Sequence, residues 1–398
     1  MLSIPTRLSI MMFLQFFVWG CWLVTMGTYL LRNLQFSGLE VAMIYATNSV
    51  AATITPIIMG VIADKFFSGE RLMAILHILG GCCMLAVYNT TEFWPCYFMM
   101  LAYNLCYVPT FSLSTSICFF HLKDPSKEFP PIRVWGTIAW VVASFLLSWL
   151  AIEEKATPLL IAGVVSIIYG CYNFSLPHTP PQPGLSWANL KGDDVRSLIR
   201  DRALLVLVAS LTLICIPAAY YYTFLNSFLN EVGVTYAAAK MSLGQLVEIV
   251  TVLAMPWFFS RFRLRSILFV GLVVWGLRYF AFSVGRPDFH DYLIYGGILV
   301  QGFAFAFTTL AAQLYVNSRV PSYLRSTAQG MIAFCTLGIG AFVGSAIAGQ
   351  QVAKFAEGAD QHDWASIFWW PGIFGMAVAI FFWWRFPAQT RMNYAEEV

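Results

Sequence analysis

The 398-residue chain is 59% hydrophobic and only 11% charged. A soluble domain carries about 25% charged residues, so this composition indicates an integral membrane protein. It is expected to be all-α, because a backbone in lipid has to satisfy its own hydrogen bonds. The net charge of +3 gives no indication of a nucleic-acid partner.

Twelve apolar runs predict twelve transmembrane helices, near 8–31, 40–63, 72–90, 94–120, 133–152, 157–176, 203–229, 237–260, 264–284, 291–316, 326–352 and 364–386. The first run is too long for a signal peptide and is expected to be retained. Residues 177–202 are rich in proline and charge and predict a cytoplasmic linker. The chain therefore divides into an N-terminal six-helix bundle over 1–176 and a C-terminal bundle over 203–398, which ends in a short cytoplasmic tail.

Basic residues set the orientation of these helices. Most of the 23 Lys and Arg residues fall in loops on the side of the N-terminus. Because cytoplasmic loops carry the excess of positive charge, both termini are expected in the cytoplasm. The nine cysteines lie almost entirely in apolar runs, with no CxxC or Cys/His spacing, so they predict packing residues and no metal site.

The stretch GQLVEIVT, residues 244–251, lies inside the apolar run 237–260. A charged side chain at the middle of a membrane helix costs roughly 2.5–3.5 kcal/mol, so Glu248 is expected to face protein or a wet cavity. Gln245 precedes it by three residues and shares its helix face. These two side chains predict the polar floor of a transport site.

A second polar face is predicted in the helix 133–152, at whose start Pro130 and Pro131 are placed. Arg133, Thr137 and Trp140 are spaced i, i+4 and i+7, so they share one side of that helix. Arg133 either anchors the helix at the lipid interface or points with the other two into a central cavity.

The segment Gly60-Val-Ile-Ala-Asp64-Lys65 resembles the Gly-x-x-x-Asp-Arg/Lys signature of the major facilitator superfamily, a fold of two pseudo-symmetric six-helix bundles. In that signature the acidic residue can clasp helix ends, so Asp64 is a candidate gating residue. Any short cytoplasmic loop is basic, however. The alternative is therefore that this segment only helps to set the orientation of the helices.

More specific strings are FPPIRVWGTIAW at 129–140, the opening MMFLQFFVWGCWLVTMGTYL, GQLVEIV at 244–250 and RSTAQGM at 325–331. They resemble the nucleoside:proton symporter family, a bacterial branch of the major facilitator superfamily. The resemblance implies proton-coupled import of nucleosides by alternating access in the inner membrane, by a monomer that needs no cofactor and is not an enzyme.

The resemblance also implies site residues. It places substrate among Arg133, Thr137 and Trp140, with Gln245, Glu248 and Phe305. A nucleobase suits aromatic rings and a Gln amide, and ribose hydroxyls suit a carboxylate. Glu248 is further expected to carry the coupled proton. Tyr222 stands where the family has an amide, and Asn226 and Gln301 are added because they are polar residues at membrane depth.

Two features leave alternatives open. Phe305 is followed by Ala306, where the family has an acidic residue, so an uncoupled nucleoside facilitator remains an alternative. A sugar or oligosaccharide proton symporter of the same fold is another.

Arg278 lies at nearly the depth of Glu248 on the next helix, and the two could form an ion pair that makes both structural. A non-transporting sensor is a less favoured interpretation, and a membrane enzyme is the least favoured, because the short loops carry no catalytic constellation.

Overall fold

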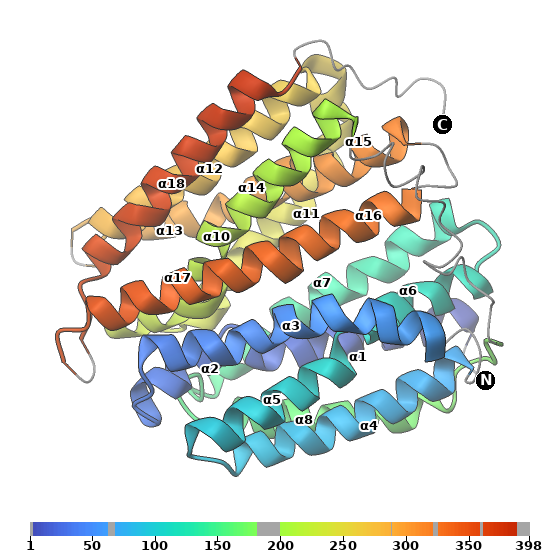
Figure 1. Ribbon diagram of the computed structural model, residues 1–398. Helices are drawn as coiled ribbons and strands as arrows, with labels where there is room; N and C mark the ends of the chain where they lie inside the picture. The colour runs from blue at the N-terminus through green and yellow to red at the C-terminus, as the bar shows by residue number, and fades with distance from the viewer. Residues whose placement is uncertain are drawn as a thin grey trace. The chain divides into compact units, whose positions relative to one another are not determined.

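The computed structural model describes residues 3–62, 68–180, 200–287, 289–320, 325–358 and 361–387. Within them the chain is helical apart from one isolated bridge between Ala356 and His362. The helices of the first half are α1 (Ile4–Trp22), α2 (Met26–Thr28), the π-helix η1 (Tyr29–Asn33), α3 (Gly38–Ile62), α4 (Gly69–Tyr88), α5 (Phe93–Tyr107), α6 (Thr110–His121), α7 (Pro125–Trp149) and α8 (Thr157–Asn173) (Figure 1).

The second half begins with three long helices and continues with shorter pieces. They are α10 (Arg202–Glu231), α11 (Ala237–Arg261), α12 (Leu264–Val284), α13 (Asp291–Leu299), α14 (Gln301–Phe305), the π-helix η3 (Ala306–Leu310), α15 (Ala311–Arg319), α16 (Arg325–Ala333), the π-helix η5 (Phe334–Gly340), α17 (Ala341–Lys354) and α18 (Trp364–Arg385).

Nine segments of the described chain are long and apolar enough to cross a membrane: Ile4–Asn33, Gly69–Tyr88, Lys127–Trp149, Arg202–Glu231, Ala237–Arg261, Leu264–Val284, Asp291–Val316, Ala328–Lys354 and Trp364–Arg385. The remaining expected crossings correspond to α3, to α5 followed by α6, and to α8. The twelve crossings predicted from the sequence are thus all occupied by helices.

Contacts group the chain into two compact units. The first is Met1–Asn189 with Tyr222–Asn230 and Thr235–Ser242, and the second is Leu190–Tyr221 with Glu231–Val234 and Leu243–Val398. The end of α10 and the start of α11 thus pack with the first helices of the chain. The expected division at 177–202 stays a prediction.

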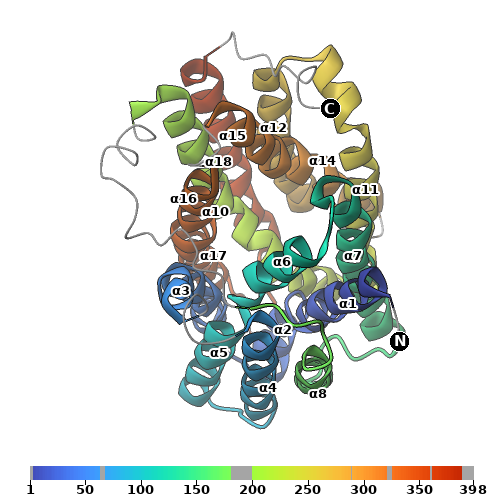
Figure 2. The same ribbon diagram turned by 90° about the vertical axis from the view of Figure 1, so that its right-hand side faces the viewer.

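The first unit is built from close helix pairs, α4 with α8 and α1 with α7 (Figure 2). A Cβ atom on Gly81 of α4 would lie 2.8 Å from the carbonyl oxygen of Gly163 on α8, so only glycine allows this approach. His77 is 1% exposed in this core, where its ring nitrogens face Ser166 Oγ at 3.1 Å and Gln15 Oε1 at 2.9 Å. These contacts join α4, α8 and α1 through polar groups.

The second unit contains the close pair α12 and α18. A Cβ on Gly375 of α18 would lie 2.8 Å from the Cα of Gly276 on α12. Small residues at such contacts let helix backbones approach in a membrane, where burial of apolar surface gives no driving force. This pair therefore packs through its backbone.

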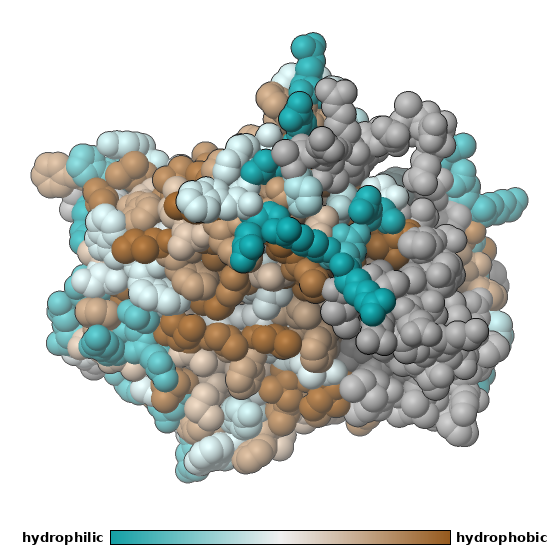
Figure 3. Space-filling model, turned by 45° about the horizontal axis from the view of Figure 1, so that its top comes forward, coloured by the Kyte–Doolittle hydropathy of each residue, from teal (hydrophilic) through white to brown (hydrophobic). Residues whose placement is uncertain are grey.

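Large apolar side chains cover much of the exposed surface. Trp149 is 78% exposed, Leu253 77% and Trp384 81%. Figure 3 shows many apolar residues at the surface of one face, interspersed with hydrophilic residues. Such a surface needs lipid around it, and the chain is a multi-pass membrane protein.

Two local features differ from the sequence prediction. Helix α7 begins at Pro125 and runs through Pro130 and Pro131, so these prolines do not mark its start. They lie within its second turn, where each removes one backbone hydrogen bond. The π-helices were not predicted, and η3 begins at Ala306, immediately after the candidate site residue Phe305.

Candidate functional site

The α7 residues of the candidate site face α1 within the first unit. The guanidinium carbon of Arg133 lies 4.1 Å from the centroid of the Phe16 ring. The rings of Trp140 and Trp19 meet edge to face with centroids 5.0 Å apart. Thr137 lies between these two positions and is half-buried. Two aromatic side chains of the neighbouring helix α1, Phe16 and Trp19, therefore contact the polar face of α7.

A third helix completes this aromatic group. Phe111 of α6 lies 5.5 Å from Phe16 and 5.0 Å from Trp19, measured between ring centroids. A Cβ on Gly136 would lie 2.6 Å from the Phe16 ring and 2.7 Å from Arg133 Nη1, so the glycine makes room for the stacked pair. No pattern in the sequence indicates Phe111 as a site residue, because an apolar ring in an apolar helix is typical of packing.

In the second unit, α11 contacts both α13 and α14 through its backbone. A Cβ on Gly302 of α14 would lie 2.2 Å from the backbone nitrogen of Glu248, and one on Gly244 of α11 would lie 2.8 Å from the carbonyl oxygen of Ile298 on α13. Glu248 and Gln245 are half-buried on α11. The close approach places Glu248 against the helix that carries Gln301 and Phe305.

Arg278 of α12 is 1% exposed and lies at the same part of the second unit. Its Nη1 donates a hydrogen bond to Gln301 Oε1, and its guanidinium carbon lies 3.9 Å from the centroid of the Tyr221 ring. Tyr221 is within electrostatic reach of both Arg278 and Glu248. The structure thus brings together Glu248, Gln301 and Arg278, and it adds Tyr221, whose neighbour Tyr222 was the predicted residue.

Asn226 lies elsewhere, in the first unit near the end of α10. Its Oδ1 accepts from Thr28 Oγ1 at 2.6 Å and from Asn230 Nδ2 at 3.0 Å, and its Nδ2 donates to Glu153 at 3.1 Å. The amide is therefore engaged by protein groups in this conformation. Its role in binding substrate stays a prediction.

Two further predictions concern gating and metals. Asp64, the candidate gating residue, lies outside the described residues. Throughout the part of the chain that the structure does describe, no group of three or more His, Cys, Asp or Glu side chains could hold a metal ion.

The chain was compared with protein families. The family model described as "Nucleoside H+ symporter" matches residues 2–391, nearly the whole chain. The chain belongs to this family. The nucleoside:proton symporter resemblance of the sequence is thereby confirmed, and the family consists of transporters rather than enzymes.

Individual relatives agree with this family assignment. The chain is 36% identical over 359 residues to the putative nucleoside transporter YegT of Escherichia coli (strain K12), covering 87% of this chain and 84% of the relative. It is 30% identical over 403 residues to xanthosine permease of the same strain, covering 97% and 96%.

Solved structures confirm the fold of this nucleoside:proton symporter family member. A crystal structure of a single-substitution variant of the nucleoside transporter NupG matches with a TM-score of 0.91 and 28% identity, covering 97% of this chain and 100% of that chain. The expected all-helical major facilitator fold with twelve membrane helices is therefore correct.

Proposed function

We propose that this protein imports nucleosides by proton symport, with alternating access around a site at the membrane midplane. The match of the nucleoside:proton symporter family over residues 2–391 carries the proposal. The geometry supports it, because a carboxylate, an amide and a guanidinium gather in the membrane at Glu248, Gln301 and Arg278.

The proposed substrate-binding residues combine aromatic, amide, hydroxyl and charged side chains. They are Arg133, Thr137, Trp140, Tyr222, Asn226, Gln245, Glu248, Gln301 and Phe305. Aromatic rings suit the flat base, whereas amide and carboxylate groups suit its polar edge and the ribose hydroxyls.

Glu248 is the proposed proton carrier. Its helix is in backbone contact with α14, so the carboxylate sits among protein groups at membrane depth. There the neutral form is favoured by burial and the charged form by a nearby cation. Binding of the nucleoside changes the balance between the neutral and charged forms of Glu248, and this couples proton transport to nucleoside transport.

The proposed location is the bacterial inner membrane, with both termini in the cytoplasm. Most of the 23 Lys and Arg residues fall on the side of the termini, which supports this orientation. The protein is proposed to act as a monomer with nucleoside, protons and membrane lipids as its partners.

Uptake into proteoliposomes tests the proposal. Uridine and adenosine uptake is measured with and without an inward proton gradient, and excess maltose serves as a competitor of a different chemical class. Accumulation that a protonophore abolishes and maltose does not inhibit is the expected result. Equilibration that ignores the gradient would show a facilitator, and no nucleoside movement would refute the proposed substrate.

A further inference from the structure

The N-terminus of α11 is capped by side chains from a distant part of the chain. The first N–H groups of a helix have no acceptor within the helix. Here the N–H of Ala238 donates to Glu153 Oε2 at 3.0 Å, and the N–H of Ala239 donates to Ser148 Oγ at 2.8 Å. Ser148 belongs to the last turn of α7, and Glu153 to the loop that leads into α8.

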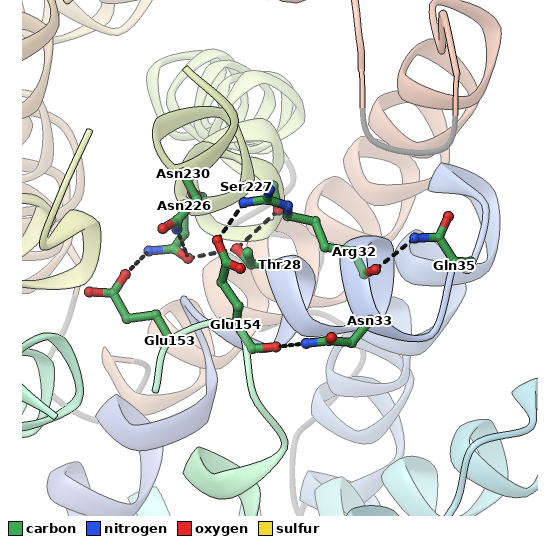
Figure 4. Close-up of polar contacts among 9 residues, drawn as sticks. All are labelled: Thr28, Arg32, Asn33, Gln35, Glu153, Glu154, Asn226, Ser227 and Asn230. Carbon is green, nitrogen blue, oxygen red and sulfur yellow. Dashed lines mark hydrogen bonds and ion pairs between the residues drawn. The ribbon is translucent and has the colours of Figure 1, made fainter. Parts of the chain in front are cut away.

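Glu153 is a buried carboxylate held by neutral donors. It is 6% exposed, and besides the N–H of Ala238 it accepts from Ser148 Oγ. It also accepts from Asn226 Nδ2 at 3.1 Å, as Figure 4 shows. A buried charge is costly unless hydrogen bonds compensate it, and the positive end of a helix dipole favours an anion. The carboxylate therefore depends on α10 and α11 staying in place.

The neighbouring residue has a different environment. Glu154 is half-exposed at 44% of its side chain and forms an ion pair with Arg32. Figure 4 shows Glu153 directed toward Asn226 and Glu154 directed toward Arg32. Both residues are carboxylates of the same loop, but among the described contacts Glu153 binds α10 and α11, whereas Glu154 binds Arg32 and Asn33 of the first half.

The first membrane segment, Ile4–Asn33, which we call span one, contributes Thr28 to the same group. Asn226 Oδ1 accepts from Thr28 Oγ1 at 2.6 Å. A Cβ on Gly27 would lie 2.2 Å from the carbonyl oxygen of Thr223, so α2 and α10 touch through their backbones beside this hydrogen bond. We call Thr28, Ser148, Glu153, Asn226 and the N–H groups of Ala238 and Ala239 the Glu153 cluster.

The Glu153 cluster lies far from the N-terminus of the chain. Thr28 is 24 residues beyond Ile4 along span one, about 36 Å at the rise of a helix. If the termini are cytoplasmic, the cluster lies on the outer side. Gln245 follows Ala238 by seven residues, about 10 Å along α11. The cap therefore fixes the outer end of the helix that carries the candidate site.

We propose that Glu153 is a positioning residue for transport. It caps α11 from the loop between α7 and α8 in the conformation of this structure, and it has to release the N–H group of Ala238 in each cycle, because alternating access reorients helices of the two halves. This inference rests on the proposed transport function. The cluster then stabilises the state that is closed on the outer side.

Glu153→Gln tests the proposal, with Glu154→Gln as the matched control. An amide has one acceptor oxygen in place of two and carries no negative charge, so it weakens the cap and removes the attraction to the positive end of the α11 dipole. Loss of the cap favours the state open to the outside. Both KM and Vmax of nucleoside uptake are expected to fall, each by at least about threefold, while Glu154→Gln keeps both.

Hydrogen exchange gives a readout that does not require transport. Peptides covering residues 235–243 should exchange at least about tenfold faster in Glu153→Gln than in the unsubstituted protein, with α4 and α8 unchanged. An increase across all helices would indicate a general loss of stability and overturn the proposal. So would unchanged exchange together with unchanged KM and Vmax.

Further variants keep the test decisive. If Glu153→Gln does not fold, Ser148→Ala removes only the acceptor for Ala239 and its bond to Glu153, and the same local exchange increase is expected. Gly27→Ala should give the same joint fall of KM and Vmax by separating α2 from α10. If the unsubstituted protein moves no nucleoside, the proposed function fails, and exchange at 235–243 still decides whether Glu153 caps α11.

Discussion

The guanidinium of Arg133 is stacked on the ring of Phe16, with 4.1 Å between the guanidinium carbon and the ring centroid. A cation over an aromatic face is stabilised by roughly 0.5–2 kcal/mol. Because Phe16 belongs to α1 and Arg133 to α7, the ring fixes the plane in which the guanidinium can meet a substrate. This geometry favours a site residue over a simple lipid anchor.

Substitution of this pair should impair uptake in a graded way. Arg133→Lys is expected to lower Vmax/KM roughly tenfold or more, because an ammonium group has neither the planar fork nor the stacking surface of a guanidinium. Phe16→Leu should lower it by roughly 2- to 30-fold, which corresponds to the loss of the cation–π interaction alone. Uptake of labelled uridine into proteoliposomes measures both.

Phe13→Leu provides the control for this series. Phe13 is on the same helix and packs on Phe17 and Trp135. Its substitution should leave Vmax/KM within about twofold of the unsubstituted protein. An equal loss in Phe13→Leu and Phe16→Leu would show that general packing of α1, and not the contact with Arg133, is responsible.

The contact between α11 and α14 predicts that Gly302 tolerates no side chain. The added methyl group of Gly302→Ala would lie 2.2 Å from the backbone nitrogen of Glu248, so the helices have to separate. Overpacking of this kind costs about 1–3 kcal/mol. The melting temperature in detergent and the nucleoside affinity should both fall.

Gly296→Ala is the matched control for this contact. A Cβ on Gly296, on the adjacent helix α13, meets nothing within 4 Å. Gly296 is half-buried with open space for a methyl group, and replacing such a helical glycine by alanine gains up to about 1 kcal/mol. The melting temperature should therefore stay the same or rise, and a fall equal to that of Gly302→Ala would contradict the role of the α11–α14 contact.

Neutralising Glu248 should separate movement of substrate from its accumulation. Glu248→Gln keeps hydrogen-bonding capacity but cannot exchange a proton, so uridine should still equilibrate across the membrane without being concentrated by a proton gradient. Counterflow and gradient-driven uptake measure the two properties. Glu92→Gln, at an exposed position before α5, should keep both, and accumulation by Glu248→Gln would eliminate the coupling role.

The N-cap of α18 predicts a pH dependence of stability. Hydrogen bonds from Ser366, one of them to Asp363 Oδ1 at 3.1 Å from the backbone N–H, lower the pKa of the Asp363 carboxyl. This contribution is present above the unfolded pKa of about 3.9 and is lost as the pH falls through the folded value. Asp363→Ala should cost about 0.5–2 kcal/mol at pH 7 and less near pH 3. Thermal unfolding at both pH values measures the difference.

The sequence predicted the twelve crossings well because apolar length is a local property of the chain. The boundaries of α12, expected near 264–284, match the observed Leu264–Val284. The fourth crossing is interrupted between α5 and α6 at Pro109, because proline has no backbone N–H to donate. The candidate residues Glu248 and Arg278 were found because ionisable groups at membrane depth are rare.

Other features depended on contacts that no local pattern reveals. The partner of Arg133 is a phenylalanine from another helix, and apolar rings are common throughout this chain. Glu153 looked like one more loop carboxylate beside Glu154 and Lys155, since its burial is produced by α10 and α11. The π-helix after Phe305 likewise has no signature in the residues that form it.

The alternative that Arg278 and Glu248 form an ion pair can be tested by charge removal. Arg278 is buried, donates to Gln301 Oε1 and stacks on Tyr221, which is itself within electrostatic reach of Glu248. Removing one member of a buried pair costs about 3–5 kcal/mol because the other charge is left uncompensated. Arg278→Met should therefore lower the melting temperature strongly.

Adding Glu248→Gln to Arg278→Met should restore most of that stability, because no buried charge then remains. The appropriate control adds Glu154→Gln to Arg278→Met, which removes a carboxylate that pairs with Arg32 and should restore nothing. For each pair of residues, the melting temperatures of the unsubstituted protein, the two single variants and the double variant form a double-mutant cycle. A recovery of the same size in both double variants would mean that Arg278 and Glu248 are not coupled, and Glu248 would then be available for the proton without an internal counter-charge.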